Sequence, residues 1–281
     1  MSYLLISIIV LIVSASPLFI HYKRKKIKAR EIVLIAMMSA ISVVANLVCA
    51  YTLPLHAGTT IVILSGISLG PEAGFLIGAM SRFISNFFMG QGMWTPWQMA
   101  ASGILGALGG IIFSKVNVIG YFDDKREINK KRANIGLKTC ILPVVIMIFT
   151  ELVGYISFIF TRQKGEIFWG WRLYFFGILG IIIYCLINRH KIPTNIVTVT
   201  VFIFITVFVI YGGIMNFATM MTSSSYMGGS TYVSLETLKL LYISGVPYDL
   251  MHAGGAAVCG FLMCDGITQK LERIKIKYGM Y

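Results

Sequence analysis

The chain has 281 residues, of which 57% are hydrophobic and only 12% are charged, and its mean hydropathy is +0.81. This composition excludes an ordinary soluble globular domain and indicates an integral membrane protein. The formal net charge of +13 would also suit a nucleic-acid-binding protein, but the sequence contains no basic soluble domain that could bind nucleic acid.

The apolar runs of the chain are continuous over roughly 17–24 residues and do not alternate, so they favour membrane-spanning helices over a β-barrel. The first run has no basic residue before it and a basic stretch after it, which favours an outside-in membrane anchor over a cleaved signal peptide. The third run is short and could be tilted or partly re-entrant. In chain order, we expect about nine segments: residues 4–22, 32–53, 59–69, 73–89, 97–113, 139–160, 173–187, 195–215 and 245–264.

Basic residues predict the orientation of these segments. Lys and Arg gather in four stretches, at residues 23–28, 115–138, 188–191 and 270–277. When the segments alternate across the membrane, all four stretches fall on the same face. Because Lys and Arg accumulate on the cytoplasmic side, we expect the N-terminus outside and the C-terminus inside.

Small residues recur at helical spacing in two parts of the chain. Glycines stand at every fourth position through one turn, and two more repeat the spacing later: Gly66, Gly70, Gly74, Gly78, Gly106 and Gly110. Such residues let helix backbones approach closely, so most of them are expected to serve internal packing. Ala36 and Ala40 form a similar strip at the cytoplasmic end of the second segment, which could face lipid, the bundle itself or a partner subunit.

Two ionisable residues lie deep in apolar segments. Arg82 lies ten residues after Glu72, about 15 Å into its helix and near the bilayer midplane, and Glu151 is similarly central. Such groups are costly in a membrane unless they are paired or wetted. Arg82 is therefore either neutralised by Glu151 or Asp249 as a structural pair, or it contacts a ligand.

The loop from Gln91 to Gln98 combines two indoles, two amides and a proline between apolar runs. Amides can bond to the edges of a heterocycle, and indoles can stack on a flat ligand. Trp94 and Trp97 could instead form an interfacial aromatic belt. We favour a recognition loop on the outer face, because belt tryptophans would not need the flanking amides.

Asp249 and His252 are three residues apart, and with Tyr248 they can share one helix face. The pair is compatible with acid–base catalysis, but nothing marks a nucleophile, a metal site or a phosphate-binding loop. We therefore expect no enzyme, no cofactor and no metal, and any ATP-driven role requires a partner. An intramembrane enzyme using these residues, or an ion-coupled carrier, is the alternative, although no inverted repeat of broken helices supports a carrier.

Four stretches, at residues 69–78, 91–99, 211–216 and 247–253, resemble the substrate-specific S component of energy-coupling factor (ECF) transporters. The resemblance covers residues 31–116 and 194–265. It implies an all-α polytopic membrane protein with a six-helix bundle. Within a single membrane domain, 1–281, we expect the parts 1–30 (extra N-terminal helix and basic linker), 31–116 (first part of the bundle), 117–193 (basic loop and two inserted helices) and 194–281 (last part of the bundle and basic tail).

The resemblance also implies a function. S components bind a vitamin or related micronutrient from outside and then associate with a membrane scaffold (T) subunit and two cytoplasmic ATPase subunits, here in a bacterial plasma membrane. Riboflavin or another flat vitamin would suit the expected site. We prefer cobalamin or a queuosine-type precursor as the substrate. The scaffold-contacting Ala-x-x-x-Ala strip of the family maps onto Ala36 and Ala40. The expected substrate-binding residues are Asn86, Gln91, Trp94, Trp97, Gln98, Asn216, Tyr248, Asp249 and His252.

Overall fold

The computed structural model describes residues 5–6, 8–13, 16, 29–52, 55–113, 125–162, 168, 170–188, 194–226 and 235–279, and all regular elements in these parts are helical. The elements are α2 (Ala29–Tyr51), α3 (Ala57–Leu69), α4 (Pro71–Met89), α5 (Thr95–Ile112), α6 (Lys125–Thr161), α7 (Trp171–Asn188), α8 (Ile196–Thr206), the π-helix η1 (Val207–Tyr211), α9 (Gly212–Tyr226) and α10 (Leu235–Lys277). The predicted all-α class is confirmed.

Helices long and apolar enough to cross a membrane lie at Ala29–Tyr51, Ile141–Thr161, Ile196–Thr222 and Glu236–Lys277, with shorter apolar helices at Ala57–Leu69 and Trp171–Tyr184. These findings fit a polytopic helical membrane protein. The count of about nine segments and their orientation stay predictions. Much of the first predicted segment, 4–22, lies outside the described residues.

Some helices extend beyond the predicted apolar runs. We predicted a loop over residues 115–138, but α6 begins at Lys125, so the second part of this stretch is helical. α10 likewise exceeds the predicted 245–264 at both ends. Hydropathy detects only the apolar part of a helix that can lie in the bilayer core. The backbone hydrogen bonds of the helix continue through polar residues as well, so the helix can be longer than the apolar run.

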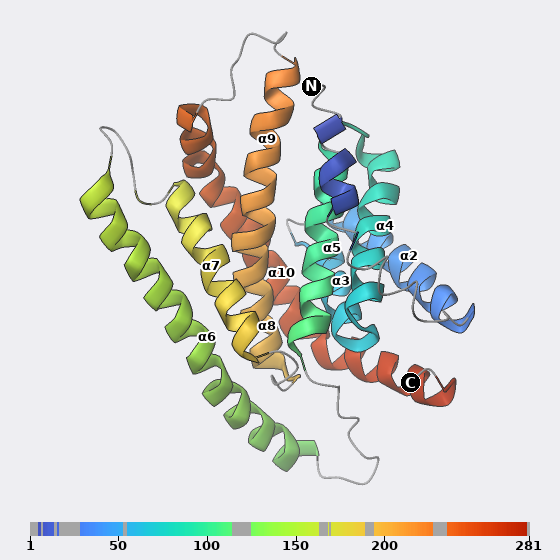
Figure 1. Ribbon diagram of the computed structural model, residues 1–281. Coiled ribbons are helices and arrows are strands. Elements are labelled where there is room, and N and C mark those ends of the chain that lie inside the picture. Colours follow the sequence, from blue (N-terminus) through green and yellow to red (C-terminus); the bar gives the residue numbers. More distant parts are fainter. Residues whose placement is uncertain are drawn as a thin grey trace.

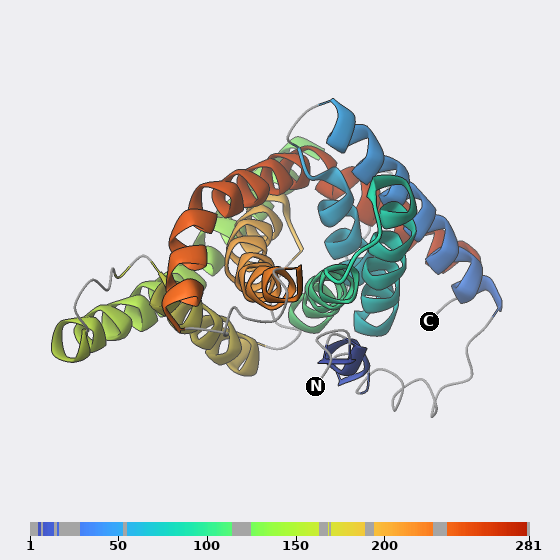
Figure 2. The same cartoon turned by 90° about the horizontal axis from the view of Figure 1, so that it is seen from above.

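The helices form two groups joined by α10 (Figure 1). α2, α3, α4 and α5 pack together on one side, and α6 lies outermost on the other side against α7 and α8. α10 bends around both groups, as the view from above shows (Figure 2), and it contacts α3, α8, α9 and η1. This path brings the middle of α10 to the starts of α3 and α9.

Glycines allow α3, α4 and α5 to touch along their backbones. A Cβ at Gly66 would collide with the carbonyl oxygen of Gly106, and one at Gly74 would collide with both of these glycines. Gly78 and Gly110 lie equally close to backbone atoms of the neighbouring helices. The expected internal packing role of these glycines is confirmed. Gly70 has the additional role of the turn between α3 and α4, where its φ of 101° favours a residue without Cβ.

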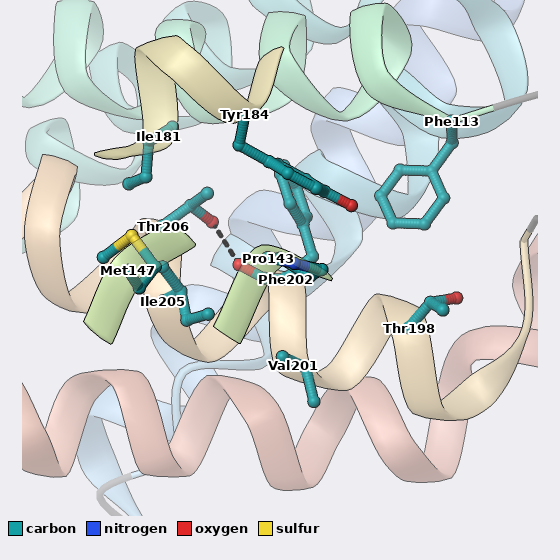
Figure 3. A pocket seen from close by; sticks show the side chains of 10 residues that line it. All are labelled: Phe113, Pro143, Met147, Ile181, Tyr184, Thr198, Val201, Phe202, Ile205 and Thr206. Atoms are coloured by element: carbon teal, nitrogen blue, oxygen red, sulfur yellow. Dashed lines mark hydrogen bonds between the residues drawn. The ribbon is translucent and has the colours of Figure 1, made fainter. Parts of the chain in front are cut away.

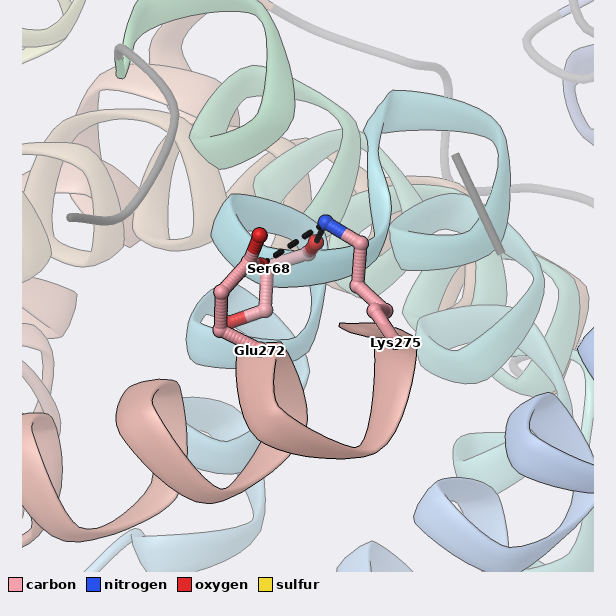
Figure 4. Close-up of polar contacts among 3 residues, drawn as sticks. All are labelled: Ser68, Glu272 and Lys275. Carbon is pink, nitrogen blue, oxygen red and sulfur yellow. Dashed lines mark hydrogen bonds and ion pairs between the residues drawn. The ribbon is translucent and has the colours of Figure 1, made fainter. Parts of the chain in front are cut away.

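Polar contacts fix the end of α10 beneath the bundle (Figure 4). Lys275 Nζ lies 2.8 Å from the carboxylate of Glu272 and donates a hydrogen bond of 2.7 Å to the carbonyl oxygen of Ser68, at the end of α3. Glu272 is only 4% exposed. The bond from Lys275 to Ser68 therefore anchors α10 against α3 at the end of the bundle opposite to the loop between α4 and α5.

Candidate functional site

Two cavities differ greatly in size. One has a volume of only about 30 Å³ and lies among α6, α7 and α8, with mostly apolar walls that include Phe113, Pro143 and Met147 (Figure 3). It is too small for an organic ligand. The other has a volume of about 480 Å³ and is lined by Asn46, Cys49, Ala50, Tyr51, Thr52, Leu55, His56, Arg82, Met89, Gln98, Tyr211, Tyr248 and His252. It is the candidate functional site.

The large cavity lies at the end of the bundle that carries the loop between α4 and α5. Its walls come from the end of α2, the two residues before α3, the later turns of α4, the start of α5, η1 and the middle of α10. Met89 and Gln98 flank the loop and line the cavity directly. With the orientation predicted from the basic stretches, this end would face outside.

Arg82 is the central polar residue of the cavity wall. It is 8% exposed, and its Nη2 donates a hydrogen bond of 2.9 Å to Thr59 Oγ1. The guanidinium carbon lies 5.5 Å from the centre of the Tyr211 ring, and Nε has no partner. The described contacts include no ion pair of Arg82 with Glu151 or Asp249, so the structural pairing considered from the sequence is not observed.

Two histidines lie beside Arg82. The rings of His56 and His252 have centroids 3.8 Å apart, and His252 Nε2 lies 3.3 Å from Thr59 Oγ1. His252 is 2% exposed, and its Nδ1 has no hydrogen-bond partner. Burial, with the nearby Arg82 charge, lowers the pKa of His56 to about 4. His56 is therefore neutral near pH 7, which leaves Arg82 as the charged group of the wall.

The amides of the predicted recognition loop bond to residues of the loop and of α4. Asn86 donates to Thr95 Oγ1 (3.0 Å) and to Gln98 Oε1 (2.8 Å). Gln91 accepts from Thr95 at 2.9 Å and donates to the Phe83 carbonyl oxygen at 3.0 Å. Gln98 is thus held in the cavity wall by Asn86, whereas Gln91 stabilises the loop itself.

The two loop tryptophans do not line the cavity. Trp97 is 4% exposed and packs edge-on against Phe217, with ring centroids 5.6 Å apart. Trp94 is half-buried, and its ring lies over Gly92 in the loop before α5. In this conformation both indoles stabilise the loop, and contact with a ligand would require the loop to move.

The face shared by Tyr248, Asp249 and His252 divides between two environments. Tyr248 and His252 line the cavity. Asp249 is 4% exposed and accepts hydrogen bonds from Tyr174 Oη (2.5 Å) and Asn216 Nδ2 (2.8 Å), on α7 and α9. No described hydrogen bond joins Asp249 to His252, so the acid–base pair considered from the sequence is not assembled.

Of the nine residues predicted to bind substrate, the cavity wall therefore contains Gln98, Tyr248 and His252. Sequence reasoning missed Asn46, His56 and Tyr211. Asn46 and His56 are polar residues in or beside apolar runs, a signal that was available. Tyr211 ends a π-helix, which re-aims side chains and often occurs at functional sites. Among the described residues, no group of three or more His, Cys, Asp or Glu side chains could hold a metal ion.

Comparisons with known proteins define the family. A helical membrane protein with a ligand-sized cavity at an end of the bundle is the class that the fold and the site indicate. The family model "ECF-type riboflavin transporter, S component" matches residues 26–166, about half of the chain. The chain belongs to this family. The match includes all of α2 to α6, and the division of the chain into a bundle and an insertion stays a prediction.

Curated relatives agree with this assignment. A UPF0397 protein of Vibrio atlanticus (strain LGP32) is 28% identical over 133 residues, which cover 45% of this chain and 66% of the relative. A UPF0397 protein of Aliivibrio salmonicida (strain LFI1238) is 31% identical over 138 residues, which cover 46% of this chain and 67% of the relative. The chain thus spans about two thirds of the length of these relatives. No solved structure gives a significant match.

Proposed function

We propose that the protein is the high-affinity binding subunit for uptake of a vitamin or related micronutrient across a bacterial plasma membrane. The observation that carries this proposal is the cavity of about 480 Å³ in a member of the S-component family. Its volume lies within the range of roughly 300–1,000 Å³ that is typical of small-molecule sites. The chain would deliver its ligand together with a T subunit and two cytoplasmic ATPase subunits.

The chemistry of the wall supports a ligand with a flat body. The rings of Tyr51 and Tyr248 and the side chains of Leu55 and Met89 offer apolar surface, while Asn46, Gln98 and the two histidines offer hydrogen bonds. A queuosine-type precursor or riboflavin, which the family description names, falls within this size class. Cobalamin, preferred from the sequence, is much larger than a drug-sized ligand, so the cavity volume does not favour it.

We infer that delivery begins with binding and closure of the loop between α4 and α5, followed by reorientation of the chain in the membrane. Energy would come from ATP hydrolysis by the partner subunits. Ala36 and Ala40 are exposed on α2, so a scaffold could contact them without unpacking the bundle. The exposed neighbours Val33 and Met37 are apolar, as a surface inside a membrane requires.

Ligand binding should depend on free space in the cavity. Ala50→Trp would fill space at the cavity wall and should weaken binding by about tenfold or more, whereas Val48→Trp, on the outer face of α2, should change affinity by less than about threefold. The ligand is first identified by mass spectrometry of detergent-purified protein, and its dissociation constant is then measured for the wild type and both variants.

Uptake is tested in proteoliposomes that contain the chain with a T subunit and ATPases. ATP-dependent accumulation of the unmodified ligand would support the proposal. If Ala50→Trp and Val48→Trp bind the ligand equally well, the binding site lies outside this cavity. Chemical conversion of the ligand would favour an enzyme.

A further inference from the structure

We infer that the ligand of the large cavity carries an anionic oxygen group, a carboxylate or a phosphate monoester, that binds to Arg82. This inference rests on the proposed function, because it names the chemical class of the substrate for the same cavity. The juxtaposition that carries it is a buried guanidinium beside two histidines, in a wall to which the described residues contribute no acidic side chain.

The charge of Arg82 is not balanced by the protein contacts that the structure describes. Its hydrogen bond goes to the neutral hydroxyl of Thr59, and its Nε has no partner. The face of the Tyr211 ring attracts a cation but does not neutralise it. A buried charge without a counter-ion raises the free energy of the protein. An anionic ligand that pairs with this charge removes that penalty, which strengthens its binding.

The nearby intramembrane carboxylates are held by other elements. Asp249 accepts its hydrogen bonds from Tyr174 and Asn216. Glu151 belongs to α6 and lies beside Gly177 of α7. The structure therefore separates the carboxylates that could have paired with Arg82 from the cavity in which Arg82 lies.

The hydroxyl of Thr59 links Arg82 to His252. Thr59 Oγ1 accepts from Arg82 Nη2, and its own hydrogen can be donated to His252 Nε2, 3.3 Å away. The other ring nitrogen of His252, Nδ1, is buried and has no hydrogen-bond partner. Arg82 Nε is likewise buried and without a partner, so the protein contacts leave the polar atoms of both cavity-lining side chains incompletely paired, which suits a charged acceptor at the guanidinium.

This assignment distinguishes the chain from a receptor for a neutral vitamin. Riboflavin carries no anionic group at neutral pH, whereas flavin mononucleotide is the same molecule with a phosphate monoester. A guanidinium matches the paired oxygens of a carboxylate or phosphate and discriminates strongly against a ligand that lacks them. A cationic group on the ligand would be repelled from this part of the wall.

The test uses matched ligand pairs on the detergent-purified full chain. The pairs are riboflavin and flavin mononucleotide, nicotinamide and nicotinate, panthenol and pantothenate, and biotinamide and biotin, together with any ligand that co-purifies. Affinity is measured by calorimetry and by the shift in melting temperature. In whichever pair binds, we expect the dissociation constant of the anionic member to be lower than that of its neutral partner by at least about tenfold. The flavin pair reports on phosphate, and the other three pairs report on carboxylate.

Arg82→Gln should reduce this preference to within about threefold. Arg172→Gln is the matched control, because Arg172 is 6% exposed but bonds to Ser157 and Thr161 away from the cavity. The control should keep the preference of the wild type. Without ligand, Arg82→Gln should melt at the same or a higher temperature, since an unbalanced buried charge is removed. Arg82→Lys, which keeps the charge, provides a second variant if the first fails to fold.

The outcomes separate the two proposals. If a ligand binds tightly but has no acidic group, or if Arg82→Gln keeps the full anion preference, the inference is wrong while the binding function stands. If folded wild-type protein neither retains nor binds any small molecule, the proposed function fails and this inference fails with it. Preference for the anionic partner in the wild type and the control, lost in Arg82→Gln, would support both.

Discussion

At the scale of single residues, Thr59 organises the candidate site. Its hydroxyl is fully buried at the first turns of α3 and contacts both Arg82 and His252. One small side chain therefore orients a guanidinium from α4 and an imidazole from α10. The buried hydroxyl of Thr59 has a polar contact with each of the two side chains, so its own burial is not penalised. The atoms without a partner are Arg82 Nε and His252 Nδ1.

The distinction between wall residues and loop residues gives a first prediction at this scale. Gln98→Ala should weaken ligand binding by about 1–2 kcal/mol, because Gln98 lies in the cavity wall. Trp97→Ala should instead lower the stability of the protein by about 3–5 kcal/mol, since the indole is buried against Phe217. Calorimetry and thermal unfolding of both variants check this. If Trp97→Ala keeps the melting temperature but loses ligand affinity, the indole of Trp97 takes part in ligand binding.

At the scale of elements, α2 shows how one helix serves two environments. Leu34, Met38 and Val43 face the bundle, while Val33, Met37 and other apolar residues of the opposite side are exposed. Ala36 and Ala40, about one helical turn apart, are exposed on this outer side. Small residues allow the backbone of another helix to approach closely in a membrane.

This arrangement predicts a partner surface. Replacing both Ala36 and Ala40 with Trp should abolish co-purification with the scaffold subunit and ATP-driven uptake, yet leave ligand affinity within about threefold, because bulk on an exposed strip blocks close approach without reaching the cavity. Leu262→Trp, on the exposed side of α10, is the control and should change neither quantity. Unchanged uptake by the double variant would mean that the strip faces lipid.

At the scale of the whole molecule, the predicted sidedness can be tested at two helix ends. Asn129 lies in the first turns of α6 and Ser224 near the end of α9. If the basic stretches are cytoplasmic, Ser224→Cys should react with an impermeant thiol reagent on intact cells, and Asn129→Cys only after permeabilisation. The native cysteines at positions 49, 140, 185, 259 and 264 are first replaced with serine or alanine. Reversed labelling would place the cavity on the cytoplasmic side.

The predictability of the fold and of the site differed for physical reasons. Helical class and the close packing at Gly66, Gly74 and Gly106 follow from local hydropathy and spacing, which a sequence displays directly. The pairing of Arg82 could not be read in this way, because both Glu151 and Asp249 lie at suitable depths. Only the rotation of each helix shows that Asp249 faces Tyr174 and Asn216.

The sequence alone determined that the chain is helical, that it belongs in a membrane, and which motifs relate it to S components, because composition and spacing are properties of the linear chain. Tertiary structure decided which side chains share the cavity. His56, Arg82, Tyr211 and His252 come from four separate parts of the chain and meet only in the folded bundle, around which α10 bends. The rotation and bending of helices depend on packing between distant segments, and that packing decides what the site can bind.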